Sequence, residues 1–231
     1  MMRQLPLGVQ LEVSSRFETF RAGKNLAVIE DLCALKRAPG QVPLWLCGAA
    51  GTGKTHLLQA AVVRLSERGG AAAYLPLERC GDLGPSILAG FEHLDAVLLD
   101  DLDEVAGEPV WEGALFTLHN ELQEHAGRLV VAARLPPSAL PWRLPDLRSR
   151  LAAASVHTLH PLPEPDHAEA LLARAAARGL EIPPETLAYL QRHAPRDFGA
   201  LCGLLDRLDS ASLATHRRLT VPLAREVLEA S

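Results

Sequence analysis

The chain has 231 residues, of which 48% are hydrophobic and 22% charged, an ordinary composition for a globular protein of one or two domains. Lysine and arginine total 23 against 28 aspartates and glutamates, which gives a formal charge of −5. A sequence-independent grip on nucleic-acid phosphates needs clustered positive charge, so this balance argues against a basic DNA-binding module.

The cysteines and histidines do not form a metal-binding pattern. The four cysteines lie far apart and the nine histidines are scattered, without the spacing of a zinc site. We therefore expect neither a structural metal nor disulfides. The chain begins without a leader-like apolar stretch, and it contains no uncharged apolar run of about 18 residues. These observations favour a cytoplasmic protein with no membrane contact.

Short apolar runs alternate with helical patterns through the first two thirds of the chain. A helical stretch at 56–67 follows the first run, and 110–125 places apolar residues close to a 3.6-residue period. This alternation predicts an α/β fold with a five-stranded parallel sheet covered by helices on both faces. The five candidate strands are 41–47, 71–77, 96–99, 129–133 and 156–159.

The pattern changes at residues 161–165, where three prolines mark a connector. The rest of the chain contains helical signals only, at 168–178, 185–192, 197–208 and 223–228. We therefore predict three parts: an N-terminal peptide over 1–12, an α/β domain over 13–162 and a small all-helical domain over 163–231.

Residues 48–55 read GAAGTGKT and fit the phosphate-loop pattern GxxxxGK[ST], with the required strand before it and helix after it. Glycines let backbone N–H groups surround a phosphate, and the helix N-terminus adds partial positive charge. The lysine then reaches the β- and γ-phosphates of a nucleotide, and the last hydroxyl can hold Mg²⁺. The predicted contacts to ADP or ATP are Gly48, Gly51, Thr52, Gly53, Lys54 and Thr55.

Two aspartates end the third apolar run. Asp100 suits the acid that completes the Mg²⁺ shell in such proteins, often called the Walker B acid. Asp101 occupies the place where a hydrolytic enzyme often carries a glutamate that polarises water. We therefore predict Thr55 and Asp100 as Mg²⁺ ligands and Asp101 as a candidate catalytic acid. The alternative is a carboxylate turn that caps the next helix.

At this point the chain resembles the AAA+ proteins of the bacterial replication-initiator group, the DnaA-related family. The segments 17–20, FETF, and 23–25, GKN, are similar to those that this family places beside the adenine. Residues 144–151, LPDLRSRL, resemble its arginine-finger segment, and 195–197, PRD, look like its sensor-II motif. The likeness runs from residue 4 to the C-terminus.

The resemblance implies an AAA+ fold with a helical lid domain and assigns roles to three further residues. Asn25 would lie beside the nucleotide, and Arg196 would reach back from the lid to the phosphates. Arg150 would be an arginine finger that acts in trans, on the nucleotide of a neighbouring protein. We expect Arg150 in an extended segment, so that Arg148, two positions away, points elsewhere. The alternative is that both arginines lie on a solvated loop and pair with Asp146.

Two features point, within this family, to the regulatory inactivators of the initiator. The sequence stops at residue 231 without the initiator's helix-turn-helix domain, so we expect no direct sequence-specific DNA binding. Residues 4–9, QLPLGV, resemble a sliding-clamp-binding peptide with Gln4, Leu5 and Leu7 as anchors, although such a hexapeptide alone is more typical of a frayed terminus or an edge strand. The implied partners are the sliding clamp (the β subunit of DNA polymerase III) and DnaA. Assembly into a homo-oligomer is a further possibility.

The sequence also departs from the family pattern. Residues 132–135 read AARL where the family carries a polar sensor-I residue, so we expect little or no intrinsic ATP hydrolysis. Residues 152–154, AAA, replace a Trp-Gly pair that usually follows the finger segment. The function implied is stimulation of the hydrolysis of DnaA-bound ATP, and hence negative regulation of replication initiation. The main alternative is a helicase-loader-like ATPase; a P-loop nucleotide kinase has only the phosphate loop in its favour.

Overall fold

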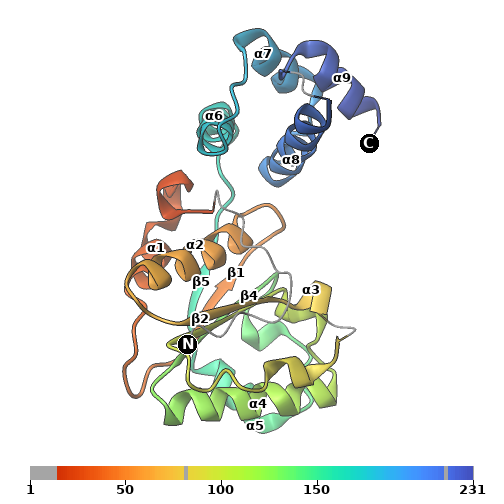
Figure 1. Cartoon of the computed structure of the whole chain (residues 1–231). Helices are drawn as coiled ribbons and strands as arrows, with labels where there is room; N and C mark the ends of the chain where they lie inside the picture. Colours follow the sequence, from red (N-terminus) through yellow and green to blue (C-terminus); the bar gives the residue numbers. More distant parts are fainter. Residues whose placement is uncertain (1–14, 81–82, 216–217, 231) are drawn as a thin grey trace.

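The computed structural model describes residues 15–80, 83–215 and 218–230, arranged as an α/β domain with a helical domain at one end (Figure 1). The predicted clamp-binding anchors Gln4, Leu5 and Leu7 lie outside the described residues.

A five-stranded parallel sheet forms the centre of the α/β domain, as the apolar runs predict. Its strand order is β2-β3-β4-β1-β5, and every neighbouring pair is parallel. The central strands are continuously apolar because helices bury both of their faces. The strands are β1 (Leu44–Cys47), β2 (Ala72–Pro76), β3 (Ala96–Asp100), β4 (Arg128–Ala133) and β5 (Ser155–Thr158).

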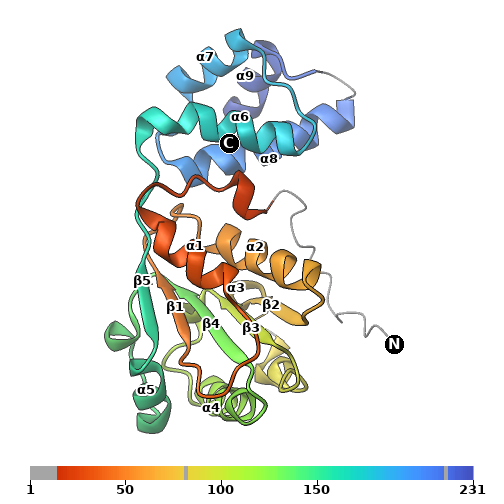
Figure 2. The same ribbon diagram turned by 90° about the vertical axis from the view of Figure 1, so that its left-hand side faces the viewer.

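The helices divide into two layers around this sheet (Figure 2). On one face, α1 (Leu26–Cys33) and α2 (Lys54–Glu67) pack on alternate strand residues such as Leu46 and Leu98. On the other face, α4 (Pro109–Glu124) and α5 (Pro145–Ala152) pack on the intervening residues, such as Trp45 and Val97. The short helix α3 (Leu77–Cys80) follows β2. The sequence patterns missed α1, α3 and α5.

The expectation of an extended segment around Arg150 is wrong, because residues 145–152 form α5. Pro145 opens the helix at its first turn, where the missing N–H costs nothing. Leu147 and Leu151, four residues apart, lie on one face and are 0% and 1% exposed. At 3.6 residues per turn, Arg148 and Arg150 are about 200° apart around the helix, so they still point in different directions.

A buried carboxylate fixes the chain just before α5. Glu112, in the first turn of α4, is 0% exposed. Its Oε1 accepts hydrogen bonds from the N–H groups of Gly107 at 2.9 Å and Arg143 at 3.1 Å, and its Oε2 accepts from Arg143 at 3.0 Å and Leu144 at 2.6 Å. The start of α5 is therefore held to the start of α4.

The C-terminal domain is a helical lid with its own core, as predicted. Leucines from all four helices, among them Leu171, Leu190 and Leu204, form this core. The contacts that tie the lid and its connector to the α/β domain include an ion pair between Arg21 and Glu169 and the hydrogen bonds of Asn25 with both backbone groups of His160. The lid helices are α6 (His167–Ala177), α7 (Pro184–His193), α8 (Phe198–Thr215) and α9 (Val221–Glu229). Within the described ranges, no helix has both the length and the apolar character needed to cross a membrane.

Candidate functional site: a phosphate-loop pocket beneath the lid

The phosphate loop makes a tight turn between β1 and α2, directly beneath the lid. Gly51 and Gly53 have φ of 76° and 90°, a left-handed conformation that favours glycine. A Cβ at Gly53 would lie 2.6 Å from the Phe20 ring, and one at Gly51 would lie 2.6 Å from Oδ1 of Asp197. Both glycines are therefore required by backbone conformation and by close neighbours.

Lys54 begins α2 and folds its side chain back along the loop. Its Nζ donates to the carbonyl oxygens of Gly48 at 2.7 Å and Ala49 at 3.0 Å, and the Thr52 hydroxyl donates to the same Ala49 oxygen at 2.9 Å. Burial lowers the pKa of Lys54, opposed by the nearby negative charge of Asp100. The ammonium is thus largely desolvated, which strengthens its attraction to any phosphate that enters.

Asp100 ends β3 beside the start of α2. The Tyr74 hydroxyl donates to its Oδ2 at 2.9 Å, the Asp101 N–H donates to its Oδ1 at 3.1 Å, and the Thr55 hydroxyl hydrogen-bonds to it. Burial raises the pKa of Asp100, and these hydrogen bonds oppose the rise. A hydroxyl and a carboxylate in contact supply the hard oxygen ligands that Mg²⁺ prefers. The residues present therefore fit a magnesium ion.

Asp101 lines the pocket in an unusual backbone conformation. Its φ is 54°, a left-handed value that aspartate tolerates better than most residues. Burial raises its pKa to about 6, with further contributions from the negative charges of Asp100 and Glu78. Its carboxylate points into a site already rich in negative charge.

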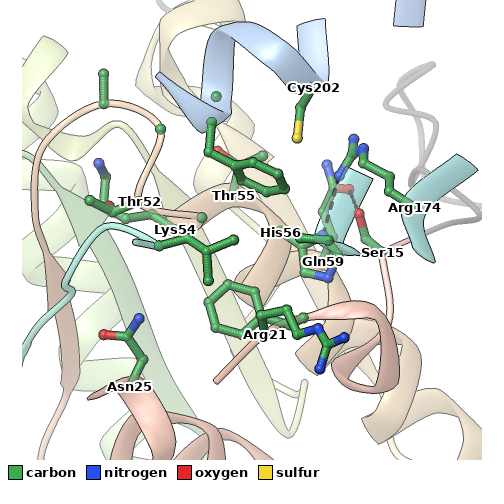
Figure 3. A pocket seen from close by; sticks show the side chains of 18 of the residues that line it. Ser15, Arg21, Asn25, Thr52, Lys54, Thr55, His56, Gln59, Arg174 and Cys202 are labelled. Carbon is green, nitrogen blue, oxygen red and sulfur yellow. Dashed lines mark hydrogen bonds between the residues drawn. The ribbon is translucent and has the colours of Figure 1, made fainter. Parts of the chain in front are cut away.

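The pocket has a volume of about 410 Å³ and is bounded by both domains. This volume lies in the range of small-molecule sites. Figure 3 shows Lys54 and Thr55 on the α2 side and Arg174 and Cys202 on the lid side, with Asn25 at the edge.

The structure brings most of the predicted binding residues together. Those that line the pocket are Asn25, Gly51, Thr52, Gly53, Lys54, Thr55 and Asp101. Gly48 and Asp100 lie next to it, bonded to Lys54 and Thr55 respectively. Asn25 is also engaged with the connector through His160. Its position fits a residue that joins the pocket wall to the lid.

Arg196 does not line this pocket. Its side chain is 88% exposed, its Nε lies 4.0 Å from Oε1 of Glu164, and it borders a separate hollow in the lid. The lid arginine that does line the pocket is Arg174, which is 12% exposed. Its Nη1 lies 3.4 Å from Nδ1 of His56 and its Nη2 3.9 Å from Oδ1 of Asp206.

Sequence reasoning missed several basic residues that line the pocket, among them Arg174, His56 and Arg134. Arg134 follows β4, and its Nε and Nη2 lie 3.4 Å from Asp103 and 3.2 Å from Glu104. Its place at the carboxyl end of a parallel strand was a signal that could have found it. Nothing in the lid sequence distinguishes Arg174 from its neighbours.

Arg150 lies far from the pocket, in an open groove between the loop 40–43, α4 and α5. Because β5 pairs in parallel with β1, the start of β5 at Ser155 lies beside Leu44, whereas the phosphate loop follows Cys47 at the other end. Arg150 comes just before β5 and therefore lies at the amino end of the sheet (Figure 2). Among the described residues, no ion pair joins Arg150 to Asp146.

The chain has the fold of AAA+ proteins, with a phosphate loop and a helical lid. Domain III of the replication initiation protein DnaA from Thermotoga maritima is similar with a TM-score of 0.77 and 24% identity, over 96% of this chain and 98% of that one. AMPPCP-bound DnaA from Aquifex aeolicus gives a TM-score of 0.64 and 20% identity, over 86% of this chain and 66% of that one. The Thermotoga maritima RuvB Holliday junction branch migration motor gives 0.56 and 18%, over 90% and 68%.

The helical domain adds a more specific likeness. Residues 164–228 match the family described as "Hda, lid domain". The chain thus combines a DnaA-like AAA+ fold with a lid of the Hda type, as the DnaA-related motifs predict.

Proposed function

We propose that the protein is a cytoplasmic AAA+ regulator that binds ADP or ATP with Mg²⁺ and promotes hydrolysis of ATP bound to DnaA. It docks on the DNA-loaded sliding clamp through Gln4, Leu5 and Leu7 and presents Arg150 to the nucleotide of DnaA. The result is negative regulation of replication initiation. The lid match and the DnaA-like fold support this reading.

The position of Arg150 carries the proposal. Its side chain is exposed, it lies at the opposite end of the sheet from its own phosphate loop, and it faces an open groove. A β-strand rises about 3.3 Å per residue, so the four residues of β1 alone separate the two ends by about 10 Å. An arginine so placed is remote from its own phosphate loop, which supports a role on the nucleotide of another molecule.

The chemistry expected of Arg150 is electrostatic. A guanidinium held against a transferring phosphoryl group stabilises the charge that develops there, and in GTPases this is worth on the order of 10³–10⁵ in rate. Mg²⁺ on the partner's nucleotide supplies the accompanying charge neutralisation. The Glu112 carboxylate fixes the start of α5 and so directs Arg150 outward.

The protein's own nucleotide is expected to serve a structural role. Thr55 and Asp100 would hold its Mg²⁺, Lys54 its phosphates and Asn25 the edge of the site nearest the connector. Ala132 and Ala133, at the end of β4, are fully buried and offer no side-chain group to orient water. The nucleotide lies between the two domains, so its binding favours one arrangement of the lid.

The test follows the nucleotide bound to DnaA in the presence of clamp and DNA. The wild-type protein should convert ATP-bound DnaA to the ADP form, and Arg150→Ala should not, although it keeps its fold and its own nucleotide. Arg148→Ala, about 200° away around α5, is the matched control and should stay active. Equal conversion by wild type and Arg150→Ala would reject the assignment.

An ATPase assay on the same purified protein tests the alternative function. A helicase-loader-like ATPase would hydrolyse ATP alone, at the turnover of about 1–10³ s⁻¹ that enzymes typically reach. Such turnover by the isolated protein, without DnaA, would favour that ATPase over the regulator.

A further inference from the structure

A line of buried polar side chains runs from the first described residue of the chain to Asp100. Ser15 is 1% exposed and its Oγ donates to Oε1 of Gln59 at 2.9 Å (Figure 3). Gln59 in turn hydrogen-bonds to the hydroxyl of Tyr74, which donates to Oδ2 of Asp100 at 2.9 Å. Gln59, Tyr74 and Asp100 are 6%, 7% and 1% exposed. The line thus joins Ser15 to α2, β2 and β3, and Ser15 and Gln59 also line the wall of the phosphate-loop pocket.

In each hydrogen bond of this line, the donor is on the Ser15 side and the acceptor is on the Asp100 side. The single hydroxyl proton of Tyr74 is donated to Asp100, so the hydrogen bond with Gln59 is donated by the Gln59 amide NH₂, while Oε1 of Gln59 accepts from Ser15. The phenol oxygen of Tyr74 then accepts from Gln59, which leaves its own O–H to donate to Asp100. Hydrogen bonds in such a chain polarise and strengthen one another.

We propose that Ser15, Gln59 and Tyr74 are positioning residues that hold the Asp100 carboxylate in the orientation that binds Mg²⁺ with the nucleotide. The inference rests on the proposed function in that it takes Asp100 as a magnesium ligand. Tyr74 occupies Oδ2 and the Asp101 N–H occupies one side of Oδ1, so the carboxylate cannot rotate away from Thr55.

Ser15 acts at a distance, through the orientation of an amide. Without its hydroxyl, the Gln59 side chain can turn over and offer its oxygen to Tyr74. The Tyr74 hydroxyl then donates to Gln59, and Asp100 loses a hydrogen bond. The orientation of the Asp100 carboxylate thereby depends on whether Ser15 keeps its hydrogen bond to Gln59. Because such coupling is reciprocal, binding of the magnesium nucleotide also stabilises the hydrogen bond between Ser15 and Gln59.

The test measures ADP affinity of the full chain by calorimetry, with Mg²⁺ and with EDTA in its place. Tyr74→Phe removes one hydrogen bond to the carboxylate, and we expect its affinity to fall about three- to tenfold with Mg²⁺ and to stay unchanged with EDTA. Tyr189→Phe is the matched control, since this lid tyrosine contacts His193 and Arg225 through its ring, and its hydroxyl has no hydrogen bond to the described residues. It should leave both affinities unchanged.

A double-mutant cycle tests the part played by residue 15. Ser15→Ala should lower the affinity with Mg²⁺ by a smaller factor than Tyr74→Phe, and the double variant should be no worse than Tyr74→Phe alone. Ser210→Ala is its control, because the Ser210 hydroxyl donates to the Asp206 carbonyl oxygen one turn earlier in α8, away from the phosphate loop. If Tyr74→Phe does not fold, the effect of Ser15→Ala on the magnesium-dependent affinity decides the question alone.

The outcomes separate this inference from the proposed function. Magnesium-dependent ADP binding that is equal in wild type, Ser15→Ala and Tyr74→Phe would overturn the inference and leave the function standing. Independent, multiplicative losses in the double variant would also overturn it. A wild-type chain that binds no ADP at all would refute the nucleotide site itself and this inference with it.

Discussion

Removing the Glu112 carboxylate should both destabilise the protein and impair the presentation of Arg150. In Glu112→Ala, three N–H groups lose a charged acceptor, those of Gly107, Arg143 and Leu144. Each unsatisfied group costs about 1–3 kcal/mol, but the segment 143–144 is partly exposed, so water can replace some of the loss. We expect a net cost of about 3–5 kcal/mol, or about 6–20 °C in Tm.

Glu112→Gln should destabilise the protein less than Glu112→Ala does. Glutamine keeps one oxygen acceptor and replaces the other with an NH₂ group that faces a backbone N–H, so we expect a loss of about 1–3 kcal/mol. Glu121→Gln, on the same helix, should change stability by less than about 0.5 kcal/mol. Thermal unfolding measures all three variants.

Glu112→Ala should impair the function of Arg150 and leave nucleotide binding at the phosphate loop intact. Below its Tm, the variant should bind ADP as wild type does and convert ATP-bound DnaA more slowly, because α5 loses its attachment at Leu144. A Tm within about 2 °C of wild type, or undiminished conversion of DnaA, would show that this carboxylate does not hold α5 in place.

Three further predictions concern other parts of the chain. Lys54→Ala should abolish ADP binding measured by calorimetry, because the phosphates lose their buried cation; retained affinity would reject the phosphate site. Gln4→Ala with Leu5→Ala should abolish binding to the sliding clamp in a pull-down and leave ADP binding unchanged, and clamp affinity equal to wild type would reject the peptide. Because the pKa of Asp101 is raised from 3.8 to about 6, its ionisation costs stability as pH rises from 4 to 6. Asp101→Asn, which tolerates the left-handed backbone, should therefore raise Tm by a few degrees at pH 7 and hardly at all at pH 4, and an equal shift at both pH values would refute this reasoning.

The sequence predicts those parts of the fold and site that depend on neighbouring residues. Each buried strand is a short apolar run, and the phosphate loop with Lys54 is a contiguous pattern, so both are visible without a structure. The helix α5 was missed because it is only eight residues long and follows a proline-rich stretch that suggests an extended chain.

The rest of the site depends on contacts between distant segments. Ser15 and Gln59 are 44 positions apart, and Tyr74 and Asp100 are 26 apart, so no local pattern reports their hydrogen bonds. Similarly, the sequence alone does not show which of the two lid arginines, Arg174 or Arg196, faces the pocket. Only the packing of the lid decides that Arg174 faces the pocket and Arg196 faces solvent.

The parallel sheet gives the molecule a polarity. Its phosphate loop lies at the carboxyl end of the strands and Arg150 at the amino end, so the surface that receives a nucleotide and the surface that offers an arginine point in opposite directions. A two-fold symmetric pair would bring like surfaces together and could not place either arginine in the other subunit's site. Under the proposed function, contact with a nucleotide-bearing AAA+ partner would therefore be head-to-tail, and each protein in such a row would act on the neighbour on one side only.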